Sequence, residues 1–364
     1  MSAVEWKKLG DVIQVLRGRR LTKTELLEEG QYPVFHGGLE PLGYYNLSNR
    51  EADSVMVINV GASAGTVGYC ESDFWSSDGC FTLSKNPLLL PKYIFCYLKQ
   101  EERKIASKVR KAGIPTLDAK VIEDINIPLI DVQRQEEIVS QLDTFTTLIS
   151  NLESELDMRR KQYEHYREVL FEENEECKVE LGTFAQVEKA KNKKRITENA
   201  YSITQKGLVP TKEFFKEKTR VTSNDTSNYY IVQKNWFVYS PSRIDVGSIN
   251  YLRDEGPAIV SPIDVVFSID TNICNPHFLL NYLLSQDGMF QILKYRIGVE
   301  GTGRRSLPFT DFAKIQVPLP SKKTQQEIVE KLDAFENLIQ TLEQEIKLRK
   351  QQYEYYREKV LTFE

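Results

Sequence analysis

The side chains of this 364-residue chain that could do chemistry are mainly clustered lysines and arginines. Such cations neutralise phosphates, and arginine can bind guanine through two hydrogen bonds in the major groove. A solvated charged face is the alternative interpretation of each cluster. The candidate nucleic-acid contacts, drawn from these clusters and from polar loop residues, are Arg17, Arg19, Arg20, His36, Ser63, Lys111, Thr116, Lys191, Lys193, Lys194, Arg195, Arg243, Arg304 and Arg305.

No recognisable catalytic, cofactor or metal motif accompanies these cations. The glycine-rich stretch 61–68 lacks both common phosphate-loop patterns, so a turn beside a strand explains it better. The three histidines, His36, His165 and His277, have no metal-like spacing, and the five cysteines form no C-x-x-C pair. We therefore expect recognition rather than catalysis, with no metal and no cofactor bound by this chain.

Total charge is a poor guide to the partners of this chain. The net charge is −4, but residues 127–176 alone carry 5 basic and 13 acidic residues. Local patches therefore matter more than the sum. The chain opens without a secretory leader, and its apolar runs are far too short to span a membrane. Together with the unpaired cysteines, this predicts a reducing, cytoplasmic location.

The sequence is an internal duplication with an offset of 190 residues. Ile127-Pro128-Leu129 corresponds to Val317-Pro318-Leu319, and Gln135-Glu136-Glu137-Ile138-Val139 corresponds to Gln325-Gln326-Glu327-Ile328-Val329. Upstream, the loop Gly113–Leu117 lies over Gly303–Leu307. Each half thus consists of a variable globular part followed by a closely matched helical segment. The acidic run Glu172–Glu176 reads as a solvated linker between the halves.

Both helical segments carry apolar residues at alternating spacings of four and three, which predicts a coiled-coil seam. We expect the two helices to pair antiparallel, with Leu142 near Tyr356, Phe145 near Tyr353 and Ser154 opposite Gln344. Pairing of each helix with a different protein is the alternative. The residues that we assign to the helix pair or to partner contacts are Leu142, Phe145, Arg159, Tyr163, Tyr166, Leu332, Phe335, Arg349, Tyr353 and Tyr356.

The globular parts are predicted to be α+β. Strands are expected near Ser54–Val60 and Trp236–Tyr239, and helices near Lys92–Arg110 and His277–Leu293. The predicted boundaries are residues 1–126 and 174–316 for the globular domains and 127–173 and 317–364 for the helical spacers. Ile138 to Leu170 spans roughly 48 Å as a helix, a length suited to holding two domains a DNA turn or more apart.

The repeated [IV]-Pro-Leu and Gln-x-Glu-Ile-Val segments, with a Leu-Gly opening and a Gly-x-x-[ST]-Leu loop in each half, resemble the specificity subunit of type I restriction–modification systems. The resemblance implies two target recognition domains separated by two long antiparallel coiled-coil helices, with pseudo-twofold internal symmetry. It implies that the chain reads a bipartite double-stranded DNA target and has no catalytic activity of its own. Two methyltransferase subunits using S-adenosylmethionine for adenine N6, and restriction/translocase subunits, would be its partners.

Three other interpretations remain open from the sequence. The chain could belong to a methylation-only or fused restriction system, which neighbouring genes would reveal. It could be a coiled-coil scaffold that binds no DNA, although the basic stretch Lys191–Arg195 speaks against this. An enzyme with a dispersed active site is the third interpretation, and a turnover assay would test it.

Overall fold

The structure is a computed structural model that describes residues 4–173, 178–204, 207–211, 225–299 and 304–363. The chain folds into two compact units. Unit 1 comprises Met1–Ser154 and Gln344–Glu364, and unit 2 comprises Glu155–Glu343. Each of the two long helices, α4 (Val132–Glu172) and α9 (Lys322–Leu361), therefore contributes one part to each unit.

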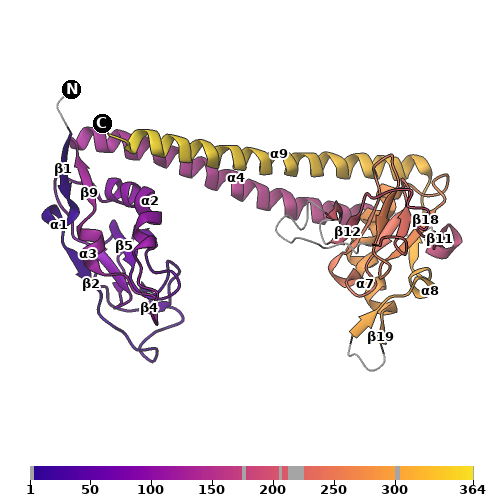
Figure 1. Cartoon of the computed structure of the whole chain (residues 1–364), viewed down its shortest axis with the longest axis horizontal. Helices are drawn as coiled ribbons and strands as arrows, with labels where there is room; N and C mark the ends of the chain where they lie inside the picture. Colours follow the sequence, from indigo (N-terminus) through magenta and orange to yellow (C-terminus); the bar gives the residue numbers. More distant parts are fainter. Residues whose placement is uncertain (1–3, 174–177, 205–206, 212–224, 300–303, 364) are drawn as a thin grey trace. The chain divides into compact units, whose positions relative to one another are not determined.

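Unit 1 is an α+β domain built on three small sheets (Figure 1). Strands β1 and β9 pair antiparallel, and the other sheets have the orders β2-β8-β5-β6 and β4-β3-β7. Helix α2 packs on β5 and β6. The elements are β1 (Glu5–Lys8), α1 (Leu9–Val12), β2 (Val15–Arg17), β3 (Tyr32–Phe35), β4 (Gly43–Tyr45), β5 (Ser54–Ile58), β6 (Val67–Cys70), β7 (Trp75–Ser76), β8 (Cys80–Leu83), α2 (Pro91–Ser107), α3 (Ala119–Glu123) and β9 (Asn126–Leu129).

Unit 2 repeats the central sheet in the order β11-β18-β15-β16 and the closing pair as β10-β21. It adds the two-stranded sheets β12-β13, β14-β17 and β19-β20. The elements are β10 (Lys178–Glu180), η2 (Leu181–Thr183), β11 (Ala185–Glu188), β12 (Tyr201–Thr204), β13 (Gly207–Pro210), β14 (Tyr230–Val232), β15 (Phe237–Tyr239), η3 (Ile244–Val246), β16 (Ile249–Tyr251), β17 (Ala258–Val260), β18 (Val265–Ile269), α6 (Pro276–Leu283), α7 (Gln286–Tyr295), β19 (Ile297–Val299), β20 (Arg304–Ser306), α8 (Phe309–Phe312) and β21 (Gln316–Pro318).

The matching sheet orders extend the sequence duplication to the whole fold, including the parts where sequence identity is low. In both units the ends of the long helices belong to the core. Ile138 of α4 and Leu361 of α9 are buried in the main core of unit 1, and Phe171 of α4 and Leu332 of α9 are buried in that of unit 2. The ends of both helices are therefore packed within the globular cores and are not attached through flexible linkers, since their terminal apolar residues are part of those cores.

Two expected elements differ in the structure. The predicted helix His277–Leu293 is two helices, because Ser285 caps α7 by accepting a hydrogen bond from the Gly288 amide at 3.2 Å. The acidic run is not a linker throughout: α4 continues to Glu172, while residues 174–176 lie outside the described part of the chain. Without proline or glycine in this stretch, the helix has no local reason to end earlier.

Helices α4 and α9 run antiparallel in each unit (Figure 1). Their register is about one turn away from the predicted one. Phe145 stacks on Tyr356 with ring centroids 5.3 Å apart, where Tyr353 was expected. Lys350 Nζ bonds Glu153 at 2.6 Å, so the expected Ser154–Gln344 pair does not form. Unit 2 contains the repeat counterparts of both observed contacts, the Tyr166–Phe335 stack and the Arg160–Glu343 ion pair.

The two remaining tyrosines explain the difference in register. Tyr353 packs against the core of unit 1, beside α2, and Tyr163 packs against that of unit 2. The Tyr163 hydroxyl lies 2.9 Å from Asn281 Oδ1 of α6. Since these rings pack on the globular parts, the aromatic residue one turn on makes the stack with the opposite helix. The hydroxyl of Tyr163 still reaches across, to Glu336 of α9 at 2.8 Å.

Candidate nucleic-acid interface

Three loops of unit 1 are joined at Asn59, at one edge of the central sheet. The Asn59 amide donates to Gly79 O at 3.1 Å, and the Leu117 amide donates to Asn59 O at 2.8 Å. The Gly61 amide adds a bond to Pro115 O at 2.9 Å. The loops 59–66, 77–79 and 110–117 therefore form one fixed surface, which carries the candidates Ser63, Lys111 and Thr116.

His36 adds a fourth segment, the end of β3, to the same surface. The Gly79 amide donates to His36 Nδ1 at 3.1 Å, and Asp78 Oδ1 lies 3.3 Å from the same nitrogen. Because the Gly79 hydrogen already points at Nδ1, we assign the ring proton to Nε2. The half-exposed imidazole then presents an N–H donor to solvent, a group that can bind a base edge or a phosphate.

The arginines at the end of β2 run along β7, next to these loops. The Arg19 amide donates to Ser76 O at 2.9 Å, and Trp75 Nε1 donates to Arg19 O at 2.7 Å. Gly18 lies between Arg17 and Arg19, and a Cβ at this position would be 1.9 Å from Ser77 O. Only glycine therefore allows the backbone at residue 18 to come this close to the backbone at Ser77. The backbone is thus fixed while the side chains of Arg17, Arg19 and Arg20 are exposed.

Unit 2 carries a basic turn organised by one buried asparagine. Asn192 is fully buried, its Oδ1 accepts from the Ile196 amide at 2.8 Å, and its Nδ2 donates to Thr197 O at 2.9 Å. Arg195 has a φ of 49°, in the left-handed region. The four cations of this turn are all exposed: Lys191, Lys193, Lys194 and Arg195.

The other candidates of unit 2 lie around the loop that corresponds to 59–66 of unit 1. Arg243 is exposed in loop 240–247, and Arg305 is exposed in β20. The Leu307 amide, just after β20, donates to Pro241 O at 3.1 Å, which joins the two segments. Arg304 lies in β20, but its side chain is outside the described residues. Among those residues, no hydrogen bond links this loop to the Lys191–Arg195 turn.

The helix candidates fall into four groups. Leu142 and Leu332 are buried in the cores of units 1 and 2, and the four aromatic rings at 145, 166, 335 and 356 form the two interhelical stacks. Arg159 bonds Gln162 and Glu155 within its own helix, and Arg349 bonds Gln352 and Glu345 in the same way. Tyr163 and Tyr353 join helix to globular part, and burial raises the pKa of both phenols.

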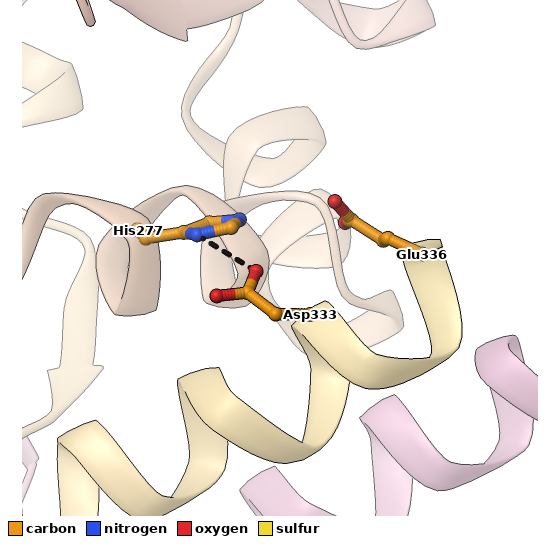
Figure 2. Close-up of side chains that lie close together, drawn as sticks. All are labelled: His277, Asp333 and Glu336. Atoms are coloured by element: carbon orange, nitrogen blue, oxygen red, sulfur yellow. Dashed lines mark ion pairs between the residues drawn. The ribbon is translucent and has the colours of Figure 1, made fainter. Parts of the chain in front are cut away.

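His277 of α6 lies against Asp333 and Glu336 of α9 in unit 2 (Figure 2). His277 Nδ1 is 3.2 Å from Asp333 Oδ1, and Glu336 accepts a hydrogen bond from the Tyr163 hydroxyl at 2.8 Å. Three such ligands could hold a metal ion. The repeat favours another reading, because the same place in unit 1 holds the ion pair of Lys92 with Asp143 at 3.0 Å. A contact between a side-chain nitrogen of the globular part and an aspartate of the helix is therefore common to both units.

Sequence reasoning missed a fully buried polar contact that recurs in both units. Gln135 and Gln325 are fully buried at the start of α4 and α9. Gln135 Oε1 accepts from the Leu90 amide at 2.8 Å, and Gln325 Oε1 accepts from the Asn275 amide at 2.8 Å. Each side-chain amide also donates to two backbone carbonyls. The signal was present, since both glutamines recur at the 190-residue offset, but repetition alone does not distinguish a buried residue from a surface one.

Comparisons with known proteins agree with this architecture. The family model of the type I restriction modification DNA specificity domain matches residues 1–158 and again residues 174–348. The chain belongs to this family.

Two relatives match this specificity subunit over nearly their whole length. A protein of Mycoplasma pneumoniae named as a type I specificity subunit is 27% identical, over 98% of this chain and 97% of its own. A Haemophilus influenzae protein named as a type I restriction enzyme specificity subunit is 28% identical, over 100% and 96%. The crystal structure of the S subunit from Mycoplasma genitalium superimposes with a TM-score of 0.62 at 18% identity, covering 100% of this chain and 98% of that one.

Membership of the family makes this chain a DNA sequence-recognition subunit of a type I restriction–modification system. The two matched segments correspond to the two repeats found in the sequence and the fold. Among the described helices, none combines the length and the apolar character that crossing a bilayer requires.

Proposed function

We propose that each unit of this specificity subunit reads one half of a bipartite DNA sequence. The observation that carries the proposal is that one scaffold is used twice with different loops. Where unit 1 has the short loop 110–117 with Ile114 and Pro115, unit 2 has the hairpin β19-β20 with Arg304 and Arg305. Since base recognition depends on which side chains reach the groove, the two loops would select different bases.

The helices would hold two identical methyltransferase subunits. Three pairs of repeat-equivalent apolar residues are exposed on them: Leu148 and Leu338 at 38% each, Met158 and Leu348 at 62% and 63%, and Tyr166 and Tyr356 at 43% and 37%. Exposed apolar groups on two equivalent surfaces suit two copies of one partner. The partners would bind S-adenosylmethionine, flip the adenine and methylate N6, and restriction/translocase subunits would join the complex. The complex would act in the cytoplasm.

Native mass spectrometry of the complex co-expressed with its methyltransferase tests this arrangement. The wild-type chain should carry two methyltransferase subunits. Met158→Lys or Leu348→Lys alone should leave one subunit, because each surface serves one copy, and the double variant should leave none. Ser150→Lys and Gln340→Lys, at exposed repeat-equivalent positions without apolar side chains, are the matched control and should retain two. Retention of two subunits by the double variant would contradict the proposal.

A further inference from the structure

We infer that Arg296 is a positioning residue that sets the DNA specificity of unit 2, an inference that rests on the proposed half-site function. Arg296 lies at the end of α7, where the chain enters the hairpin β19-β20, and its side chain is only 9% exposed. An arginine on a surface loop rarely loses this much contact with water unless it is held by partners.

The guanidinium of Arg296 joins three points on two segments. Nη1 bonds Asp245 Oδ2 at 2.7 Å, and Nη2 donates to Ser242 O and to Arg305 O, each at 3.2 Å. Ser242 and Asp245 belong to loop 240–247, which carries the exposed Arg243. The Arg305 carbonyl belongs to β20, whose Arg305 side chain is exposed. Arg296 therefore fixes the hairpin against the loop without facing solvent itself.

Arginine suits this role better than other residues would. Its planar group offers five donors in a fixed fork, so a single side chain can hold a carboxylate and two carbonyls at once. Among the described residues, the other hydrogen bonds that connect β20 and its flanks to this part of unit 2 lie at the base of the hairpin. There the Leu307 amide donates to Pro241 O, and the Tyr239 hydroxyl donates to Leu307 O at 2.9 Å. The hydrogen bond from Arg296 to the Arg305 carbonyl holds the hairpin at a point further from its base.

Unit 1 has no equivalent clamp among its described residues. Thr116 pairs with Arg110, as Ser306 pairs with Ile297, so Arg296 corresponds to Val109 in unit 1. Val109 is partly buried against the apolar core. The loop of unit 1 is thus held by packing and backbone bonds, and the hairpin of unit 2 by an ionic clamp. Loss of Arg296 should accordingly affect one half-site only.

The test is single-molecule sequencing of genomic methylation in cells that carry the complete system with the wild type, Arg296→Met or Arg296→Lys. Arg296→Met keeps the apolar stem but removes the donors. We expect methylation of sites with one altered base pair in one half of the motif to rise at least tenfold, with the other half read as before. Arg296→Lys should restore part of the preference, and Asp245→Asn should relax the same half-site. Lys314→Met removes an exposed cation of unit 2 outside the clamp and should change neither half.

The readouts separate the possible outcomes. If the wild-type chain directs no split motif, the proposed function fails. If the wild type does so and Arg296→Met leaves the base preferences of both halves unchanged, or relaxes both equally, the clamp is wrong while the function stands. The methyltransferase stoichiometry of Arg296→Met should match the wild type, because the bonds of this side chain go to loop 240–247 and β20 and not to α4 or α9. Thermal unfolding shows whether the variant is folded at the growth temperature. If Arg296→Met does not fold, Asp245→Asn becomes the test variant. Unchanged base preferences in Asp245→Asn would then overturn the inference.

Discussion

Single buried polar residues set the conditions under which each unit is stable. Asp264, in the loop before β18, is 8% exposed, and burial raises the pKa of its carboxyl to about 7. An aspartate in the unfolded chain titrates near pH 4, so the folded state binds its proton more tightly than the unfolded state. This carboxylate therefore destabilises unit 2 increasingly as the pH rises from about 4 to about 7, and fully above that.

Asp264→Asn should remove this pH-dependent cost. The variant is expected to unfold like the wild type near pH 4 and to gain stability relative to it up to pH 8, by about 2–4 kcal/mol there. Thermal unfolding of the wild type and the variant at pH 5, 6, 7 and 8 measures the difference. A gap in melting temperature that does not change with pH would contradict the raised pKa.

Gln135 should matter more to stability than its polar type suggests. Gln135→Leu would leave the Leu90 amide and the carbonyls of Leu88 and Ile130 without the partner they have now. We expect the free energy of unfolding of unit 1 to fall by about 2 kcal/mol, since a buried unsatisfied group costs about 1–3 kcal/mol. Urea unfolding measures it, with the exposed Gln133→Leu on the same helix as the control. Equal stabilities of the two variants would refute the role of Gln135.

The long helices show what periodicity can and cannot predict. The alternating spacing of four and three predicted both helices, because the seam pattern depends only on the local sequence. Their antiparallel direction was predicted from the presence of both helices in one chain. The register depends on which aromatic residues of the helices pack against the globular parts. This packing is a tertiary contact, which the helix sequence alone does not specify. Tyr353 and Tyr163 sit on the same seam as Tyr356 and Tyr166, so no pattern in the helix alone separates them.

The observed register can be tested by disulfide formation. Glu153→Cys with Lys350→Cys should cross-link readily under mild oxidation, because the two side chains meet in the structure. Ser154→Cys with Gln344→Cys, the pair expected one turn away, should cross-link at least tenfold more slowly. Gel mobility under non-reducing conditions reads out both variants, against a background without the native cysteines. Faster cross-linking of the second pair would contradict the observed register and support the one predicted from the sequence.

The duplication governs the molecule as a whole. The sequence predicted the family and the repeat, because matching segments recur at one offset. The polar contacts that shape the candidate interface were less accessible. Arg296 reads as one more surface cation until the fold brings Asp245 and Arg305 to it. Asn192 likewise looked unremarkable among four basic neighbours, although it organises their turn.

The central claim is that the two units recognise different halves of one DNA target. Genome-wide mapping of methylated adenines, in cells with the complete system and in cells lacking only this chain, tests it most directly. We expect a split motif with a constant gap and a modified adenine in each half, present only with this chain. A continuous motif, or methylation that persists without the chain, would contradict it.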